Sequence, residues 1–491
     1  MFKATFLAHQ GWLFRAQGYS LLVDPLLGES FGHGGLLGQI YPPRELDVSA
    51  FPPVNAIVIS HEHDDHFDIP SLHQLDRRIP VYLSTAVSEA GRDLLHSMGF
   101  CRVLPLHPGH EHRLGPLRLT TFAIDHRGRG HGDEWEVYPF VLRDEQGDGS
   151  FASSIDVPPP TSMLLALSKL APRPGIWCYA NNFTSAAHQR LGTDRPAPTC
   201  EPATLASLVL RRYAAIEREW GQPAAALICG AGWSFAGTRK ALNHAVFPLS
   251  SDALAQSLAA LAPNSRCIAA TPGLTIHMRS GEIVDIKEGE TFLKSQPREL
   301  WPDRDYRPTL RTLADYPAAC GKPYFDCACL PELLEGLADL GRFLYGGPLF
   351  CALHSLGNDD TGDLRPALAL RLRSDPAGDA FTLRYEPRAC AFVTSTCEDP
   401  VGTFVSGIEC WASDLLALLR GEIGPSALCY AGHLRTWNHS PSQVYVSPDM
   451  LWHFAHPLRR PEAAAALYRR LLATLPETVP QIAAARVPAP S

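Results

Sequence analysis

One six-residue segment, residues 61–66 with the sequence His-Glu-His-Asp-Asp-His, carries the residue types that point most directly to chemistry. It has the pattern H-x-H-x-D-H and follows an apolar run at residues 54–59, which is predicted to be a buried strand. Side chains two positions apart in an extended segment point the same way, so His61 and His63 can bind one ion. Asp65 and His66, after the turn, can face a second ion. Imidazole and carboxylate donors suit a pair of divalent ions, zinc first, with iron or manganese as alternatives.

A site for two ions needs more ligands than this segment supplies, and those ligands should also lie at strand ends. His126 follows a predicted strand at 117–124, and Asp156 follows one at 150–155. His244 comes after a glycine-rich break that ends the strand at 224–229. We expect Asp156 to bridge the two ions through its two oxygens. The expected ligands are, for one ion, His61, His63 and His126, and for the other, Asp65, His66 and His244.

Asn182 is the alternative to Asp156 as the bridging residue. It ends a predicted strand at 176–180, where another carboxylate could have stood. With the bridge aligned there, the second ion would bind weakly, because an amide oxygen is a poor bridging ligand. We therefore favour Asp156, although the 88 residues from Asp156 to His244 (244 − 156 = 88) are a long separation.

Five further residues could contact a substrate. His9 ends the first strand, on the edge where a cleft should lie. Arg127, Arg129 and Trp135 follow a predicted ligand and could bind an anionic or planar group, or form an ordinary polar loop. Trp233 could equally line a pocket or pack in the core.

Composition narrows the class of protein. A chain of 491 residues with 45% hydrophobic and 19% charged residues is typical of a globular protein with two or three domains. A net charge of −8 argues against a nucleic-acid partner, which would require a basic face. We find no signal peptide and no stretch of the ~20 apolar residues that span a bilayer. Thirteen cysteines without a framework spacing favour a reducing, cytoplasmic location.

The order of predicted elements suggests two folded regions. Residues 1–285 alternate strands and helices, as in an α/β domain that would be catalytic. Prolines among charged residues mark a linker at 286–318. Residues 319–479 are predicted to form a second, α+β domain, and residues 480–491 a disordered Pro/Ala tail.

The ligand pattern resembles the metallo-β-lactamase superfamily over about residues 1–285. The opening residues 6–13, the Val-Asp-Pro-Leu run at 23–26 and the Asp-His-Arg-Gly-Arg-Gly run at 125–130 resemble the branch that includes N-acyl-phosphatidylethanolamine phospholipases and ascorbate-phosphate lactonases. This resemblance implies an αββα sandwich with two metals in a cleft at one edge of two facing sheets. The region around residues 415–424, residues 451–454 and the last helix weakly resembles sterol-carrier-like modules.

Three functions follow from these residues. The first is hydrolysis of a small-molecule ester, phosphoester, lactone or amide by a metal-bridging hydroxide that Asp65 orients. The second is oxidation by a di-iron centre on the same scaffold, since His and carboxylate ligands serve both metals. The third is hydrophobic-ligand binding by the C-terminal domain, for which a role in homodimerisation or stability is the alternative.

Overall fold

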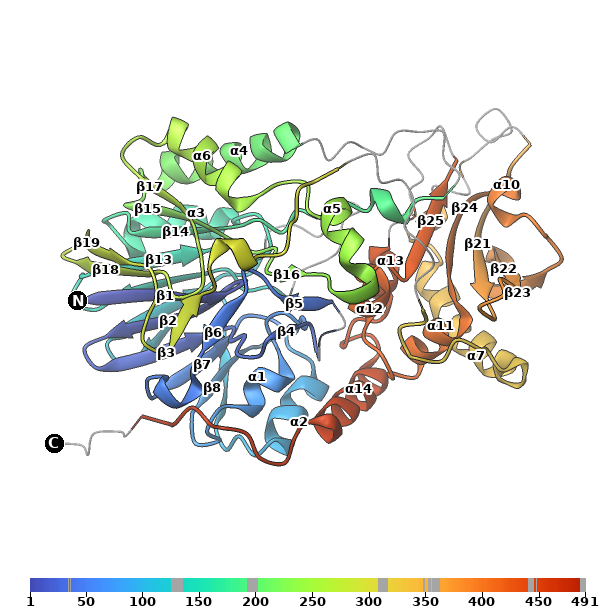
Figure 1. The fold of residues 1–491 in the computed structure, drawn as a ribbon, viewed down its shortest axis with the longest axis horizontal. Coiled ribbons are helices and arrows are strands. Elements are labelled where there is room, and N and C mark those ends of the chain that lie inside the picture. The colour runs from blue at the N-terminus through green and yellow to red at the C-terminus, as the bar shows by residue number, and fades with distance from the viewer. Residues whose placement is uncertain are drawn as a thin grey trace.

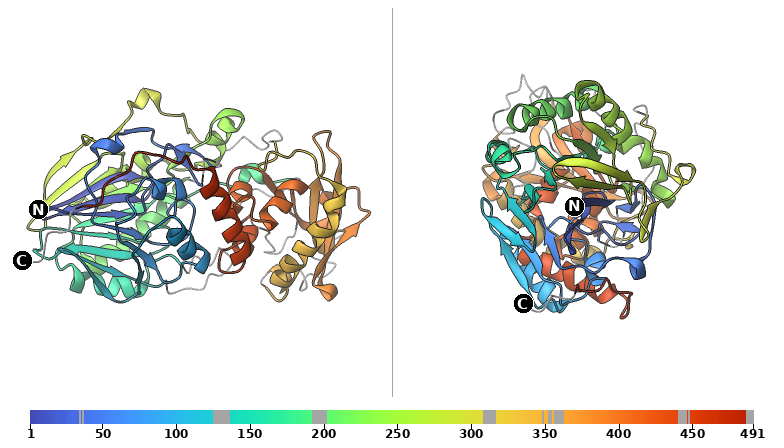
Figure 2. Two further views of the ribbon diagram at one scale, coloured as in Figure 1. Left: turned by 90° about the horizontal axis from the view of Figure 1, so that it is seen from below. Right: turned by 90° about the vertical axis from the view of Figure 1, so that its left-hand side faces the viewer.

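The computed structural model describes residues 1–33, 35, 37–124, 136–191, 202–307, 317–347, 349–351, 355, 363–439, 446 and 448–485. Two β-sheets face each other in the N-terminal part, with helices on their outer sides (Figure 1). The view along the sheets shows the same layers end-on (Figure 2, right). The predicted αββα sandwich with a second α+β region is the observed architecture.

The first sheet has eight strands. One of them, β7 (Ala56–Ile59), is followed by the loop that carries the H-x-H-x-D-H segment. The order of the sheet is β19 (Glu282–Lys287), β18 (Thr275–Arg279), β1 (Phe2–Ala8), β2 (Gly11–Ala16), β3 (Tyr19–Val23), β7, β8 (Val81–Ser84) and β9 (Val103–Leu106). The neighbouring pairs β3–β7, β7–β8 and β8–β9 are parallel, and the remaining pairs of this sheet are antiparallel. Helices α1 (Ile69–His73), α2 (Glu89–Ser97) and α14 (Pro461–Thr474) lie on its outer side.

The second sheet has seven strands. Its order is β10 (Glu111–Leu114), β11 (Leu117–Thr121), β12 (Phe140–Asp144), β13 (Ser150–Ser153), β14 (Ile176–Ala180), β15 (Ala225–Cys229) and β17 (Arg266–Ala269). Helices α3 (Thr161–Leu170), α4 (Pro202–Trp220) and α6 (Ser251–Leu261) pack on its outer side.

Alternation along the strands explains how both faces of each sheet are buried. In β7, Ala56 and Val58 belong to the core between the sheets, whereas Ile57 and Ile59 pack under the helices on the outer side. A parallel strand buried on both faces is apolar at every position, which is the run that the sequence shows. The backbone of β7 therefore delivers the residues after Ile59 to one edge of the sandwich.

Short strands and a helix complete this region near that edge. Strands β4 (Ser30–Phe31), β5 (Gly38–Ile40) and β16 (Trp233–Ser234) form a small sheet. Helix α5 (Asn243–Val246) follows β16 along the chain. Strand β6 (Arg44–Leu46) pairs with β20 (Leu293–Ser295). The residues expected to form a linker from 286 therefore pack on the first region at least as far as Arg304, whose guanidinium lies 3.5 Å from the ring centre of Phe247.

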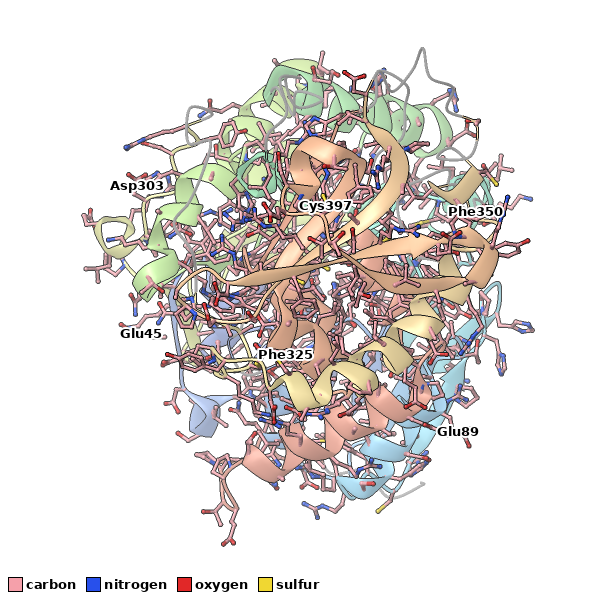
Figure 3. The ribbon with its side chains drawn as sticks, turned by 90° about the vertical axis from the view of Figure 1, so that its right-hand side faces the viewer. Glu45, Glu89, Asp303, Phe325, Phe350 and Cys397 are labelled. Carbon is pink, nitrogen blue, oxygen red and sulfur yellow. The ribbon has the colours of Figure 1, made fainter. Side chains whose placement is uncertain are left out.

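The C-terminal region is built on a five-stranded sheet. Its order is β23 (Ala391–Ser395), β22 (Ala380–Glu386), β21 (Arg365–Arg373), β24 (Phe404–Trp411) and β25 (Leu434–Asn438). The same region contains the helices α7 (Leu330–Leu344), α10 (Pro400–Thr403), α11 (Ala412–Leu419), α12 (Pro425–Cys429) and α13 (Asp449–Phe454). Figure 3 looks onto this region, where Phe325 and Cys397 are labelled. No helix among the described residues combines the length and apolar character needed to cross a membrane.

The end of the chain returns to the first region. Helix α14 packs beside α2, so that Tyr468 shares a hydrophobic core with Leu94, and Figure 3 shows Glu89 of α2 next to this helix. Beyond α14, Ile482 and Ala484 form β-bridges with Leu75 and Val54. The prediction of a disordered tail is therefore wrong for residues 480–485, because their backbone groups pair with the sandwich, and residues 486–491 lie outside the described chain.

Candidate metal centre

Six side chains with metal-binding atoms converge at the end of β7. Two groups of three could each hold an ion, one made of His61, His63 and Asp156, the other of His9, Asp65 and His66. Asp156 joins the groups, because its Oδ2 lies 3.4 Å from Nε2 of His61 and 2.8 Å from Nε2 of His66. The imidazole ring centres of His61 and His66 are 4.2 Å apart. Asp156 thus occupies the position between two neighbouring donor sets.

The hydrogen bonds around His61 and His66 determine which nitrogen of each ring faces the cluster. Asp24 accepts from the Ser60 hydroxyl at 2.6 Å and lies 2.9 Å from Nδ1 of His66. Because the single hydroxyl proton of Ser60 goes to Asp24, its oxygen accepts the proton on Nδ1 of His61, 2.9 Å away. In the neutral form of both rings Nε2 therefore keeps its lone pair, the form in which a histidine binds a metal ion while a carboxylate or hydroxyl orients it.

His63 is oriented the other way. Its Nε2 lies 2.8 Å from Oε1 of Glu136, so Nε2 carries the proton and, in the neutral ring, Nδ1 has the lone pair. Glu136 is buried and also faces Nε2 of His456, which reaches it from the C-terminal region at 3.0 Å. Although burial raises its pKa, hydrogen bonds from His456 and His63 hold the pKa of Glu136 well below its usual value. Trp452 of α13 meets the His63 ring edge-on, with the ring centres 5.0 Å apart.

His9 lies at the cluster but differs from the other three histidines. Its Nδ1 accepts a hydrogen bond from the backbone N–H of Gly232 at 3.2 Å, which leaves the proton on Nε2. That Nε2 is 3.1 Å from Oδ2 of Asp65. This arrangement favours a role for His9 in orienting Asp65. It argues against His9 as a metal ligand and against the substrate contact expected from the sequence.

Asp156 follows β13, as expected, and its second oxygen is fixed by amides. Gln10 donates to Oδ1 at 2.6 Å, and the side-chain amide of Asn182 donates to the same oxygen. Asn182 also accepts from the backbone N–H of Ala231 at 3.2 Å. Asn182 is therefore a neighbour that holds the carboxylate, and Asp156 is the residue that lies between the two donor groups.

The electrostatics of the cluster favour added positive charge. Burial, together with the nearby His66 and His63, lowers the pKa of His61 to about 4, so its imidazole is neutral. Burial lowers the pKa of His66, but Asp156, Asp65 and Asp24 outweigh it and the pKa rises well above the usual value. Likewise, His66 and His61 hold the pKa of Asp156 far below its usual value against the effect of burial. Three carboxylates gathered around one imidazole attract a cation.

Unpartnered nitrogens show that the residues present fit metal ions. The Nε2 atoms of His61 and His66 are buried and make no hydrogen bond of acceptable geometry with any described residue. Buried polar atoms are normally paired, so such atoms require an explanation. A set of imidazole nitrogens and carboxylate oxygens aimed at shared points is the donor set of zinc, iron or manganese.

Two further predicted residues, His244 and Trp233, make contacts outside the two donor groups. Nδ1 of His244 lies 3.0 Å from the backbone oxygen of Asp305, and its Nε2 faces Asp303 at 4.0 Å. His244 lies on α5, which the chain reaches only after β16, and it belongs to neither donor group among the described residues. Trp233 is buried, stacks on Phe31 and belongs to a hydrophobic core cluster. Four other predicted residues lie outside the described chain: His126, Arg127, Arg129 and Trp135.

The remaining two residues of the segment, Glu62 and Asp64, point toward the C-terminal region. Glu62 accepts from the backbone N–H and the hydroxyl of Ser88, both at 2.6 Å, and from the hydroxyl of Tyr468 at 2.7 Å. The hydroxyl of Ser426 donates to Asp64. Burial raises the pKa of both carboxyl groups, that of Asp64 to about 6 with help from Asp65. The segment at residues 61–66 therefore supplies candidate metal ligands and also contacts the C-terminal region.

Sequence reasoning missed the residues that orient the ligands. Asp24 ends β3 in the Val-Asp-Pro run, a signal comparable to that of Asp156, and could have been found. Glu136 and His456 carry no such signal. They meet only because the C-terminal region folds back over the cluster.

Comparison with known proteins supports the fold of the first region. Residues 19–156 match the family model of the beta-lactamase superfamily domain. Uncharacterized proteins of Mycobacterium tuberculosis and Mycobacterium bovis are 33% identical over 70 residues, which is 14% of this chain and 18% of theirs. The chain therefore matches less than a fifth of the length of these curated relatives.

Two solved structures that are similar to this chain belong to proteins named after different reactions. An isothiocyanate hydrolase from Delia radicum gut bacteria is 14% identical and has a TM-score of 0.38, with 56% of this chain and 99% of that chain covered. CmlA, a diiron beta-hydroxylase from Streptomyces venezuelae, is 14% identical with a TM-score of 0.35, covering 57% of this chain and 54% of that chain. These likenesses do not choose between hydrolysis and oxidation.

Proposed function

Residues 19–156 form a beta-lactamase superfamily domain in a sandwich of the metallo-β-lactamase fold, and on this premise we propose that the protein is a dinuclear metal-dependent hydrolase. The proposed substrates are small molecules with an ester, phosphoester, lactone or amide bond. The observation that carries the proposal is the place of Asp156, with one oxygen within 3.4 Å of Nε2 of both His61 and His66. A carboxylate in that place can bridge two ions.

The donors divide between two ions. His61 through Nε2 and His63 through Nδ1 would hold the first, and His66 through Nε2 with Asp65 would hold the second. Asp156 would be shared. His126 is proposed as a further ligand of the first ion, on the sequence pattern alone. Zinc is the metal we propose first, with iron or manganese as alternatives for the same donors.

Two divalent ions in this cluster would lower the pKa of a bound water toward about 7 and polarise the carbonyl or phosphoryl oxygen of the substrate. Asp65 would accept a hydrogen bond from the attacking water. Burial raises its pKa, but His66 and His9 hold it well below the usual value, so the carboxylate is ionised. His9, 3.1 Å away, fixes the orientation of that carboxylate.

Several narrower interpretations stay predictions. They are the phospholipase and lactonase branch, the sterol-carrier-like character of the C-terminal region, and a cytoplasmic location. The last is supported by the twelve described cysteines, all of which are free. Di-iron oxidation is the competing function, because His and carboxylate donors suit iron as well as zinc.

The test is a matched set of assays on the full chain, stripped of metal and reloaded with zinc, manganese or iron(II). We expect reloaded protein to hydrolyse at least one of 4-nitrophenyl acetate, bis(4-nitrophenyl) phosphate, a γ-lactone or an anilide, and stripped protein to be inactive. Oxygen consumption by an iron-loaded protein that hydrolyses none of these compounds would replace hydrolysis by oxidation.

A further inference from the structure

A cavity lies where the metal cluster meets the C-terminal region. It encloses about 630 Å³, its open side included, and His63 forms part of its wall. The H-x-H-x-D-H segment lines one side, and α11, α13, α14 and the chain between α11 and α12 line the other. The cavity therefore adjoins a proposed metal ligand.

The free surface of the cavity is mainly apolar. Leu418, Ile423, Trp452 and Leu467 contribute hydrophobic side chains to the wall, together with alanines and prolines. An apolar surface binds an apolar group because their contact removes apolar area of both from water. The C-terminal side of the cavity thus offers contact area for a hydrophobic group.

Most of the polar side chains in the wall already have partners. Glu62 is bonded to Ser88 and Tyr468, and Asp64 to Ser426. Arg460 donates to the backbone oxygen of Leu419 at 3.0 Å, and its guanidinium lies over the ring of Phe454 at 4.9 Å. Nδ1 of His33 and Nη1 of Arg460 have no hydrogen-bond partner among the described residues. The wall can therefore make few polar contacts to a ligand, and its two buried carboxyl groups disfavour an anion.

We propose that this cavity binds the apolar part of the substrate, an uncharged aliphatic or aromatic group, and places the adjoining bond at the metal cluster. The cleavage of that bond rests on the proposed function, whereas binding of the apolar group does not. Because Glu62, His63 and Asp64 belong to the wall, the first region and the C-terminal region form the site together. The C-terminal region is not a separate ligand-binding module but one half of the pocket.

Binding is tested first without metal. Full-length protein stripped of metal is titrated with N-phenyl-1-naphthylamine, a neutral fluorescent probe, and the probe is displaced with octanamide or octanoate. Ala455→Trp places a large ring in the cavity and should weaken probe binding at least tenfold, and Trp452→Ala should weaken it as well. Leu165→Trp, on an exposed site of α3, is the matched control and should bind as the natural protein does.

Two results overturn the proposal. One is unchanged probe affinity in a folded Ala455→Trp variant and in Trp452→Ala. The other is stronger displacement by octanoate than by octanamide, which would show an anion site.

A second experiment separates this inference from the proposed function. Metal-loaded protein is assayed with 4-nitrophenyl esters from acetate to octanoate, and kcat/KM should rise at least tenfold with chain length. In Ala455→Trp this rise should disappear while the acetate ester is still cleaved. Probe binding without any hydrolysis would leave the pocket in place and remove the hydrolase. Hydrolysis that is independent of chain length, without probe binding, would remove the pocket and leave the hydrolase.

Discussion

His456 approaches Glu136 from the C-terminal region, with Nε2 of the histidine 3.0 Å from Oε1 of the carboxylate. The same oxygen is 2.8 Å from Nε2 of His63. One buried carboxylate therefore connects a proposed metal ligand of the sandwich to a residue nearly 400 positions later in the chain (456 − 63 = 393). The C-terminal region contributes to the cluster itself and not only to its surroundings.

Replacing His456 should weaken the first metal site without removing a ligand. Loss of a partner that orients a ligand typically lowers metal affinity by about 10–100-fold, so His456→Ala should fall in this range. His456→Gln retains an N–H donor and should recover part of the affinity. The measurement is competition with a chromophoric chelator. His107→Ala, on an exposed histidine, is the control, and equal affinities in His456→Ala and His107→Ala would contradict the role of His456.

Asp156 and Asn182 should respond differently to removal. Asp156→Ala takes away the carboxylate between the two donor sets, so metal content should fall by at least one ion and activity should be lost. Asn182→Ala removes a donor to Asp156 and the acceptor of the Ala231 N–H, but no proposed ligand, so the metal content should stay at two ions. Elemental analysis of both variants decides. Loss of an ion from Asn182→Ala, with none lost from Asp156→Ala, would reverse the assignment of the bridge.

His244 should be dispensable. Its ring faces the backbone of Asp305 and the side chain of Asp303, so His244→Ala should keep full metal content and activity within about twofold. His66→Ala is the matched comparison, because it removes a buried nitrogen directed at the cluster, and it should lose the second ion. A drop in metal content in His244→Ala would show that α5 reaches the cluster in solution.

The contact between Glu62 and Tyr468 should stabilise the fold. Tyr468→Phe deletes one hydrogen bond to a buried carboxyl group and should lower the free energy of unfolding by about 1–3 kcal/mol. Urea denaturation measures this difference. Tyr324→Phe, at an exposed tyrosine, should change it by less than about 0.5 kcal/mol. Equal effects of the two substitutions would mean that α14 does not hold the segment.

Local sequence patterns predict much of the sandwich. The apolar run before His61 forms a strand because both of its faces are buried, and Asp156 follows its strand because β13 ends at the same edge. Ligands that sit at the ends of strands can be found in this way, since the strand itself fixes where they lie.

The remaining parts depend on contacts between distant segments. His244 satisfied the rule of a histidine after a strand, but it lies on α5 beyond β16 and belongs to neither donor group among the described residues. His9 was expected near the substrate, and only the Gly232 N–H shows that it orients Asp65. The return of residues 480–485 to pair with Val54 and Leu75 likewise has no local signal, because it depends on the packing of α14.

Native mass spectrometry of freshly purified full-length protein tests the central claim most directly, because it counts the metal ions bound to each chain. The convergence of His61, His63, Asp65, His66 and Asp156 predicts a mass increase of two divalent ions per chain, which a strong chelator removes together with hydrolysis. A chain that binds no ion or one ion, and whose hydrolysis survives the chelator, would contradict the dinuclear site.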